Sequence, residues 1–104
     1  MANYLFAYKG GSMAQTDEER QAVMAAWGGW FGTLGAAIVD AGNPFGPAAT
    51  VVDGGSVSDG ASSQLSGYSV IDAHSLAQAS ELAKGCPVLA AGGSVEVYET
   101  MQVM

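Results

Sequence analysis

The clearest structural signal in the chain lies in residues 67–101, GYSVIDAHSLAQASELAKGCPVLAAGGSVEVYETM, which predict a strand, a capped helix, a tight turn and a second strand. Residues 68–71 are β-prone, and Ser75 and Gln78 stand in the Ser-x-x-Gln order of a capping box that opens a helix. We expect Gly85 to end this helix in the left-handed conformation, and the proline two residues later cannot continue it. This segment predicts half of a small α+β sandwich.

The N-terminal third of the chain has the same order of strand and helix. Residues 4–8 are a short β-prone run, and Thr16 and Glu19 form a second capping box. The helix that follows has Trp30 at the edge of an apolar stripe of the kind that packs on a sheet: Val23, Met24, Trp27, Phe31 and Leu34. Close packing against another backbone is expected at the glycines of this helix, which are costly there: Gly28, Gly29 and Gly32.

The middle of the chain predicts short strands and turns. Residues 36–40 are expected to form a strand before the turn signal at 42–44. Residues 50–53 and 56–58 predict a hairpin that flanks a mobile loop over 59–66. The complete order is strand, long helix, strand, strand, helix, strand, which is the ferredoxin-like β-α-β-β-α-β arrangement of an α+β fold.

That arrangement places two helices on one face of an antiparallel sheet and leaves the other face bare. The strand at 4–8 alternates aromatic with aliphatic residues, so both faces of the sheet are apolar and the bare one needs a cover. The simplest cover is the same face of a second copy, packed sheet on sheet about a two-fold axis. We therefore expect one domain over residues 1–104 that forms a homodimer through its open sheet face.

Composition limits the classes of function. Three Lys and Arg against ten Asp and Glu give a net charge of −7, which repels phosphate backbones and anionic lipid headgroups, so nucleic-acid binding is not expected. The single cysteine forms no intramolecular disulfide, and no apolar run approaches the roughly 18 residues of a membrane span. We expect a soluble, cytoplasmic protein with neither nucleic acid nor membrane as a partner.

Two charged residues are the candidates for catalysis. Lys9 ends the first strand beside a glycine pair, where a buried amine would bind a carboxylate or act as an acid. Asp40 precedes the turn at 42–44, and we expect it to point toward the same end of the sheet as Lys9. Each residue also suits a plainer role, Lys9 at an exposed strand end and Asp40 as the cap of a turn.

Aromatic residues predict a cleft for a small molecule. Tyr8, Trp27 and Tyr68 would line the space between the sheet and the first helix, with apolar walls and hydroxyl tips that suit a small aromatic or unsaturated acid. An aromatic stripe of this kind equally suits a plain core. Asn43 is a further candidate to contact the ligand, and Cys86 is expected to be a buried thiol in a loop that walls the pocket.

Other chemistry has little support in the sequence. His74 is the single histidine, and we expect it to be exposed because it stands just before a helix-capping residue. One His, one Cys and scattered carboxylates give no metal-ligand spacing, and the glycine pairs lack the Lys-Ser/Thr of a phosphate loop. No metal and no cofactor are expected.

Several short motifs, taken in order, resemble one family. They are YLFAY at 4–8 followed by a glycine pair, AAWG at 25–28, GNP at 42–44, GY at 67–68, AKGCP at 83–87 and GGSVEV at 92–97. Together they span nearly the whole chain and resemble the YCII-related (DGPF-type) family. The resemblance implies a dimeric α/β barrel of ferredoxin-like subunits. The resemblance implies less about activity, because only a few members of that family resemble lyases or dehalogenating enzymes that act on muconate-type ring-cleavage products. The acid-base machinery proposed for those members is a His-Asp pair.

The chain departs from that family pattern at its histidines. The His that some relatives carry in the first helix falls near Met24 or Trp27, and Val88 stands where close relatives favour a His after Cys-Pro. Asp40 is the best match for the aspartate of the pair. Two hypotheses follow: a non-catalytic domain that binds a small aromatic or muconate-like acid, or a lyase or isomerase with Lys9 and Asp40 as acid-base or carboxylate-binding groups.

Overall fold

The computed structural model describes residues 2–11 and 15–103. Its elements in chain order are β1 (Ala2–Lys9), α1 (Asp17–Leu34), the 3-10 turn η1 (Gly35–Ala37), β2 (Ile38–Asp40), β3 (Ala49–Val51), β4 (Val57–Asp59), β5 (Leu65–Ala73), α2 (Leu76–Ala83), α3 (Pro87–Ala90) and β6 (Ser94–Glu99).

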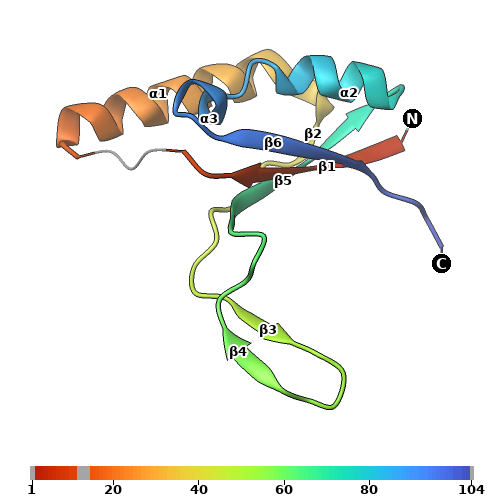
Figure 1. Cartoon of the computed structure of the whole chain (residues 1–104). Coiled ribbons are helices and arrows are strands. Elements are labelled where there is room, and N and C mark those ends of the chain that lie inside the picture. Colours follow the sequence, from red (N-terminus) through yellow and green to blue (C-terminus); the bar gives the residue numbers. More distant parts are fainter. Residues whose placement is uncertain (1, 12–14, 104) are drawn as a thin grey trace.

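Four strands form an antiparallel sheet in the order β2-β5-β1-β6, and the helices lie on one of its faces (Figure 1). The central strands pair from Ala2 opposite Ala73 to Tyr8 opposite Gly67, and the register shifts between Tyr8 and Lys9. The predicted ferredoxin-like α+β fold is confirmed, with α3 as a third, short helix that the sequence did not predict. The other face of the sheet carries no helix.

Both predicted capping boxes form. The Thr16 hydroxyl accepts a hydrogen bond from the Glu19 amide at 3.1 Å, and the Ser75 hydroxyl accepts one from the Gln78 amide at 3.1 Å. In each box the Glu or Gln side chain accepts reciprocally, at 2.6 Å, from the amide just before the capping residue. These local bonds satisfy the free amides of the first helical turn, which is why both helices begin where the sequence predicts.

The core lies between the sheet and the helices. Its buried residues include Tyr4, Phe6, Tyr8, Trp30, Leu34 and Ile71. The predicted stripe on α1 is wrong in its N-terminal half, because Val23 and Met24 are 45% and 74% exposed whereas Trp30 is buried. The physical reason is that the first turns of α1 extend beyond the end of the strands, where no sheet lies beneath them (Figure 1).

Gly85 follows α2, whose last residue is Ala83, but the conformation predicted for it is wrong. It does not adopt the left-handed conformation. Instead, the Trp30 indole packs on it: a Cβ at Gly85 would lie 3.0 Å from Cδ1 of Trp30, whose Nε1 donates to the Leu82 carbonyl at 3.1 Å. The chain then enters α3, where Pro87 takes a first-turn position that requires no amide hydrogen.

The α1 glycines also differ from expectation. A Cβ at each of the three positions, Gly28, Gly29 and Gly32, would meet no atom of the described residues within 4 Å, so the predicted close packing on another backbone is not seen in residues 2–11 and 15–103.

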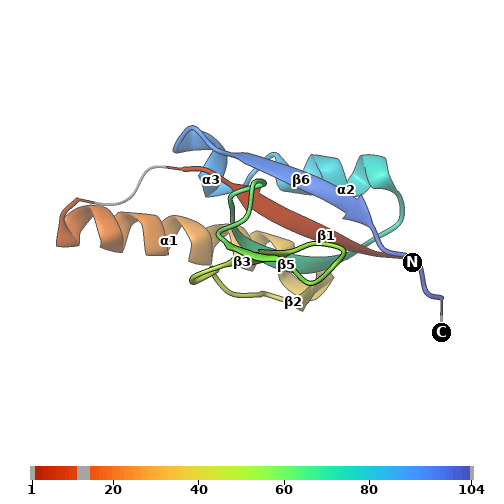
Figure 2. The same ribbon diagram turned by 60° about the horizontal axis from the view of Figure 1, so that its bottom comes forward.

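The middle segment contains the predicted hairpin with different bounds. Residues 36–37 belong to η1, so the strand expected over 36–40 is only Ile38–Asp40. The hairpin is confirmed as β3 paired with β4, and it stands apart from the four-stranded sheet (Figures 1 and 2). The loop expected over 59–66 is shorter, because β5 begins at Leu65.

We predict that Gly85→Ala destabilises the fold by about 1 kcal/mol or more, because the new methyl group presses on the Trp30 indole. Gly32→Ala is the matched control: its site is exposed and open, so the change should stabilise α1 by about 0.5–1 kcal/mol. Urea unfolding followed by tryptophan fluorescence measures both. If Gly85→Ala is as stable as Gly32→Ala, the indole does not determine this position.

Candidate functional site

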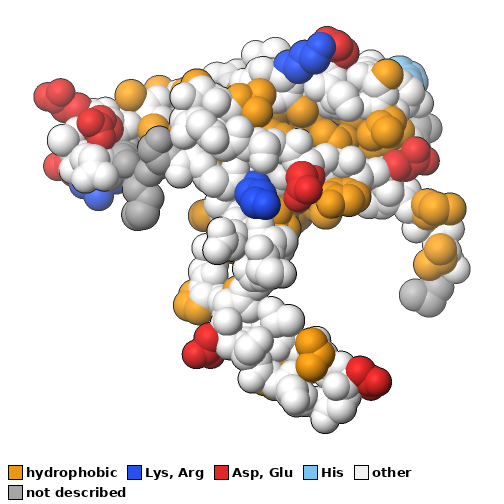
Figure 3. Space-filling view, viewed as in Figure 1, with side chains coloured by type: hydrophobic (Ala, Val, Ile, Leu, Met, Phe, Trp, Pro, Cys, Tyr) orange, Lys and Arg blue, Asp and Glu red, His pale blue; other side chains and the backbone are white. Residues whose placement is uncertain are grey.

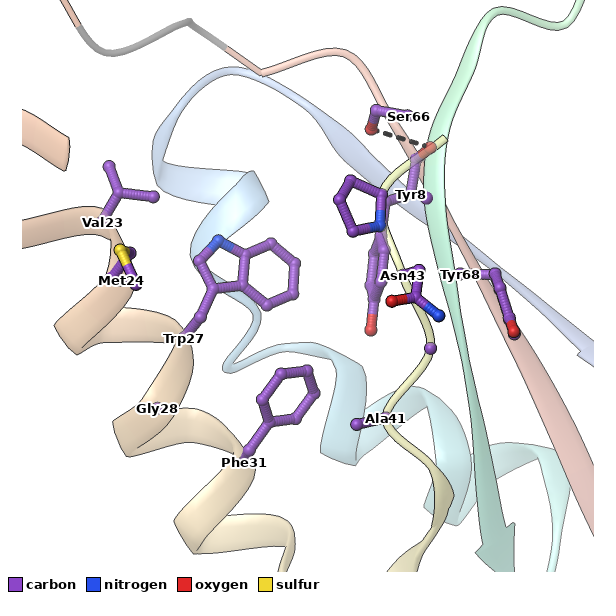
Figure 4. Close-up of a pocket in the computed structure, with 13 residues that line it drawn as sticks. Tyr8, Val23, Met24, Trp27, Gly28, Phe31, Ala41, Asn43, Ser66 and Tyr68 are labelled. Carbon is purple, nitrogen blue, oxygen red and sulfur yellow. Dashed lines mark hydrogen bonds between the residues drawn. The ribbon is translucent and has the colours of Figure 1, made fainter. Parts of the chain in front are cut away.

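A cleft of about 580 Å³ opens between α1 and the segment that leaves β2 (Figure 4). One wall is the overhanging part of α1, and the other is the linker 41–44 with the start of β5. The residues that line it are mostly apolar: Tyr8, Val23, Met24, Trp27, Gly28, Phe31, Ala41, Gly42, Asn43, Pro44, Ser66, Gly67 and Tyr68. The volume lies within the range of small-molecule sites, roughly 300–1,000 Å³.

Aromatic rings form the side of the cleft that meets the core. The Tyr8 and Trp27 rings meet edge to face with centroids 5.0 Å apart, and Phe31 lies 5.8 Å from Trp27. Trp27 in turn packs at 5.7 Å on the buried Trp30. Figure 4 shows Trp27 and Phe31 projecting from α1 toward the linker. These contacts hold Trp27 in place while part of its surface stays open to the cleft.

A buried chain of hydrogen bonds joins the core to the linker. The Tyr8 hydroxyl donates to Ser69 Oγ at 2.7 Å, and Ser69 Oγ donates to the Ala41 carbonyl at 2.6 Å. Ser69 is fully buried. Burial raises the pKa of Tyr8 to about 12, so its phenol stays neutral near pH 7 and acts as a donor. The chain therefore fixes the linker against β1 and β5.

The linker approaches β5 closely because of Gly42. Its φ is 77°, and a Cβ there would run into the Tyr68 carbonyl oxygen and carbon. Directly after Gly42, the Tyr68 amide donates to the Asn43 carbonyl at 3.4 Å and the Phe45 amide donates to the Ser66 carbonyl at 2.9 Å. Glycine is thus required for the linker to lie against the strand and form a wall.

Four of the five predicted ligand-binding residues meet in this cleft: Tyr8, Trp27, Asn43 and Tyr68. The fifth, Cys86, is buried as expected but does not line the cleft. Burial raises the pKa of its thiol to about 11, which keeps it protonated and unreactive near neutral pH.

The two predicted catalytic residues are not brought together. Lys9 lies on β1 opposite Leu65 of β5, and Asp40 lies on β2 opposite Val70 of β5; both are exposed. Their two partners on β5 are five residues apart, which is about 16 Å along the strand. Neither lines the cleft. The Asp40 carboxylate accepts from the Gly42 amide at 2.9 Å and from the Tyr68 hydroxyl at 3.4 Å, which is the geometry of a turn cap.

Sequence reasoning missed the α1 residues at the mouth of the cleft. Val23 and Met24 were assigned to sheet packing, yet they line the cleft. Length gave no signal, because α1, at 18 residues or about 27 Å, is about as long as the eight-residue β1. The overhang depends on where the helix lies along the sheet, which the sequence pattern does not specify.

The remaining candidates lie outside the cleft. His74 is exposed, as predicted, and its backbone amide donates to the Gln78 side chain. Within residues 2–11 and 15–103, no three His, Cys, Asp or Glu side chains come together in a way that could hold a metal ion. None of the helices in this described part has the length and apolar character that a membrane crossing requires.

The fold and the site define the class of protein: a ferredoxin-like α+β domain with an apolar, aromatic-lined cleft beside its first helix. The chain belongs to the YCII-related domain family, whose model matches residues 2–103. Comparisons with curated proteins and with solved structures found no match. Membership gives the family without assigning a reaction to the cleft.

We predict that the free energy of unfolding falls in alkali. Burial raises the pKa of Cys86 from 9.0 to about 11 and that of Tyr8 from 10.0 to about 12, so the unfolded chain releases these protons first. Below about pH 9 neither group changes the free energy of unfolding. Above its pKa in the unfolded chain, each group lowers the free energy of unfolding by at most about 1.4 kcal/mol per pH unit.

Urea titrations across this pH range measure the loss, and Cys86→Ala is the matched variant. It should flatten the fall between about pH 9 and 10, before Tyr8 contributes. A free energy of unfolding that stays constant in the wild type from about pH 8 to 11 would contradict the assignment of both buried groups.

Proposed function

We propose that the chain is a small-ligand-binding domain that holds a small aromatic or muconate-like organic acid in the cleft, as part of a homodimer. The observation that carries the proposal is the convergence of Tyr8, Trp27 and Asn43 on one apolar cleft. Tyr68 also lines the cleft, but its ring lies on the other face of β5 from Ser69 and stacks on Phe45. The cleft lies between two walls, α1 and the linker 41–44. These walls suit a flat ligand that inserts between them. Its ring would stack against Trp27 and Phe31.

The polar end of such a ligand has few partners in the cleft. Among the lining residues, polar side chains come from Asn43, Ser66 and the two tyrosines, and none is a Lys, Arg, His, Asp or Glu. We infer that the ring supplies most of the binding energy and that the carboxylate lies at the mouth, solvated and within reach of the Asn43 amide. A buried carboxylate without a cation would be costly, which sets this orientation.

The same lining argues for binding without catalysis. Its titratable side chains are Tyr8 and Tyr68, and the pKa of Tyr8 is raised to about 12 by burial. General acid-base catalysis is most efficient when the group titrates near the working pH, and the Tyr8 phenol does not. The single histidine, His74, lies outside the cleft.

The homodimer is proposed through the open sheet face. A row of apolar side chains crosses that face, because Leu5 stands opposite Val70 on one side and opposite Tyr98 on the other. Tyr98 is 53% exposed in the single chain. Figure 3 shows hydrophobic side chains along the sheet beneath the helices. A second copy stacked on this row would remove it from water.

The alternative, a lyase or isomerase that uses Lys9 and Asp40, has no supporting observation within one chain. The two residues lie about 16 Å apart along β5, and Asp40 is engaged in its turn.

The test is a thermal-shift titration with cis,cis-muconate, benzoate and 4-hydroxybenzoate. We predict that at least one raises the melting temperature by several degrees at saturation, because a ligand at about 100 times its Kd adds roughly 2.7 kcal/mol. Trp27→Ala should abolish the shift. Leu76→Ala is the matched control, since Leu76 is a half-exposed apolar residue on α2 outside the cleft.

No shift with any of the three acids would contradict the proposed ligand class. An equal loss in both variants would contradict the cleft as the site.

A further inference from the structure

The β3–β4 hairpin, here called the arm (residues 45–64), contacts the body at its first residue, Phe45, whose ring stacks on Tyr68 and whose amide donates to the Ser66 carbonyl. Its two strands form their own sheet and pair with no strand of the main sheet. The arm leaves the body on the side opposite the helices, which is also the side of the open sheet face (Figures 1 and 2). A two-stranded hairpin alone in water is marginally stable, so the arm requires a contact to hold its structure.

The two faces of the arm differ in chemistry. Val51 stands directly opposite Val57, so both side chains lie on one face, and they are 67% and 65% exposed. Thr50 stands opposite Ser58 on the other face, and the Thr50 hydroxyl donates to the Gly60 carbonyl at 2.7 Å. The first face, here called the apolar face, has two uncovered valines and also carries Ala49 opposite Asp59, whereas the second carries Thr50 and Ser58.

The exposed area of the whole chain indicates the size of the missing contact. A compact monomer of this mass exposes about 5,400 Å², whereas this 10.5 kDa chain exposes 7065 Å². Its radius of gyration is 15.2 Å, against about 13 Å for a compact chain of this length. The excess, about 1,600 Å², falls within the area that each subunit of an obligate homodimer buries.

We propose that the arm grips a second copy of this chain, with its Val51 and Val57 face packed on the partner. The proposal extends the dimer of the proposed function and does not depend on the ligand. A copy stacked on the open sheet face lies beside the arm, and two-fold symmetry gives each chain one arm and one surface that receives it. Apolar side chains of the sheet face and of the arm would then pack against the same partner.

The net charge of the chain opposes dimer formation, so the attraction between two copies has to come from apolar packing. Each chain carries a net charge of −7, so two copies repel each other, and the arm itself bears Asp53 and Asp59. An anionic partner such as a membrane surface is disfavoured for the same reason. Because salt screens the repulsion and leaves apolar contacts intact, the dimer should tighten as ionic strength rises.

Two aspartate substitutions at neighbouring arm positions test the proposal. Val57→Asp places a charge on the apolar face, and Ser58→Asp places the same charge on the polar face. Sedimentation equilibrium gives the dimer dissociation constant of each variant and of the wild type. We expect a wild-type dimer, at least a tenfold higher dissociation constant for Val57→Asp, and less than a twofold change for Ser58→Asp.

Each outcome bears on the proposal. A wild-type protein that stays monomeric would overturn both the arm contact and the open-face dimer. A dimer with equal dissociation constants in all three proteins would overturn the arm alone. Equal weakening by both substitutions would overturn the assignment of its apolar face.

Near-UV circular dichroism of the buried Trp30 checks that the main sheet stays folded in each variant. As a second variant, Val51→Ser with Val57→Ser removes the apolar face without adding charge and should weaken the dimer in the same direction. A dimer unchanged by this pair would contradict the proposal. Failure of the ligand titration would leave these results intact, because the arm experiment contains no ligand.

Discussion

The cleft depends on one buried chain of hydrogen bonds, from the Tyr8 hydroxyl through Ser69 Oγ to the Ala41 carbonyl. It connects the central strands to a linker that no regular sheet pairing holds along its length. Since Ser69 is fully buried, loss of either bond would leave a polar atom without a partner in the core, at a cost of about 1–3 kcal/mol. The neutral phenol of Tyr8 therefore does structural work, and it also forms the floor of the cleft.

The open wall of the cleft comes from an offset between α1 and the sheet, because the helix and the strands are of similar length but are not aligned end to end. The helix α1 extends past the strands that it covers, and the apolar stripe of its first turns has no sheet to pack on. Val23 and Met24 remain exposed there, whereas Trp30 and Leu34 further along are buried. The same sequence pattern thus produces core at one end of the helix and a binding surface at the other.

Features set by neighbours in sequence were predictable, whereas features set by distant contacts were not. The capping boxes at Thr16 and Ser75 formed as expected because their bonds span three residues. Gly85 was misread because its role depends on Trp30, 55 positions earlier in the chain. Pattern and turn signals also placed aromatic residues and Asn43 at one site, yet the distance between Lys9 and Asp40 needed the strand register.

The central claim is that a flat organic acid binds against Trp27 in a cleft held by Tyr8. The most direct test records the indole N–H signals of ¹⁵N-labelled protein during titration with benzoate or cis,cis-muconate. Trp27 lines the cleft, whereas the indole N–H of Trp30 donates a hydrogen bond to the Leu82 carbonyl. The account predicts a saturable shift of the Trp27 signal with a much smaller one for Trp30. Equal shifts, or none, would contradict it.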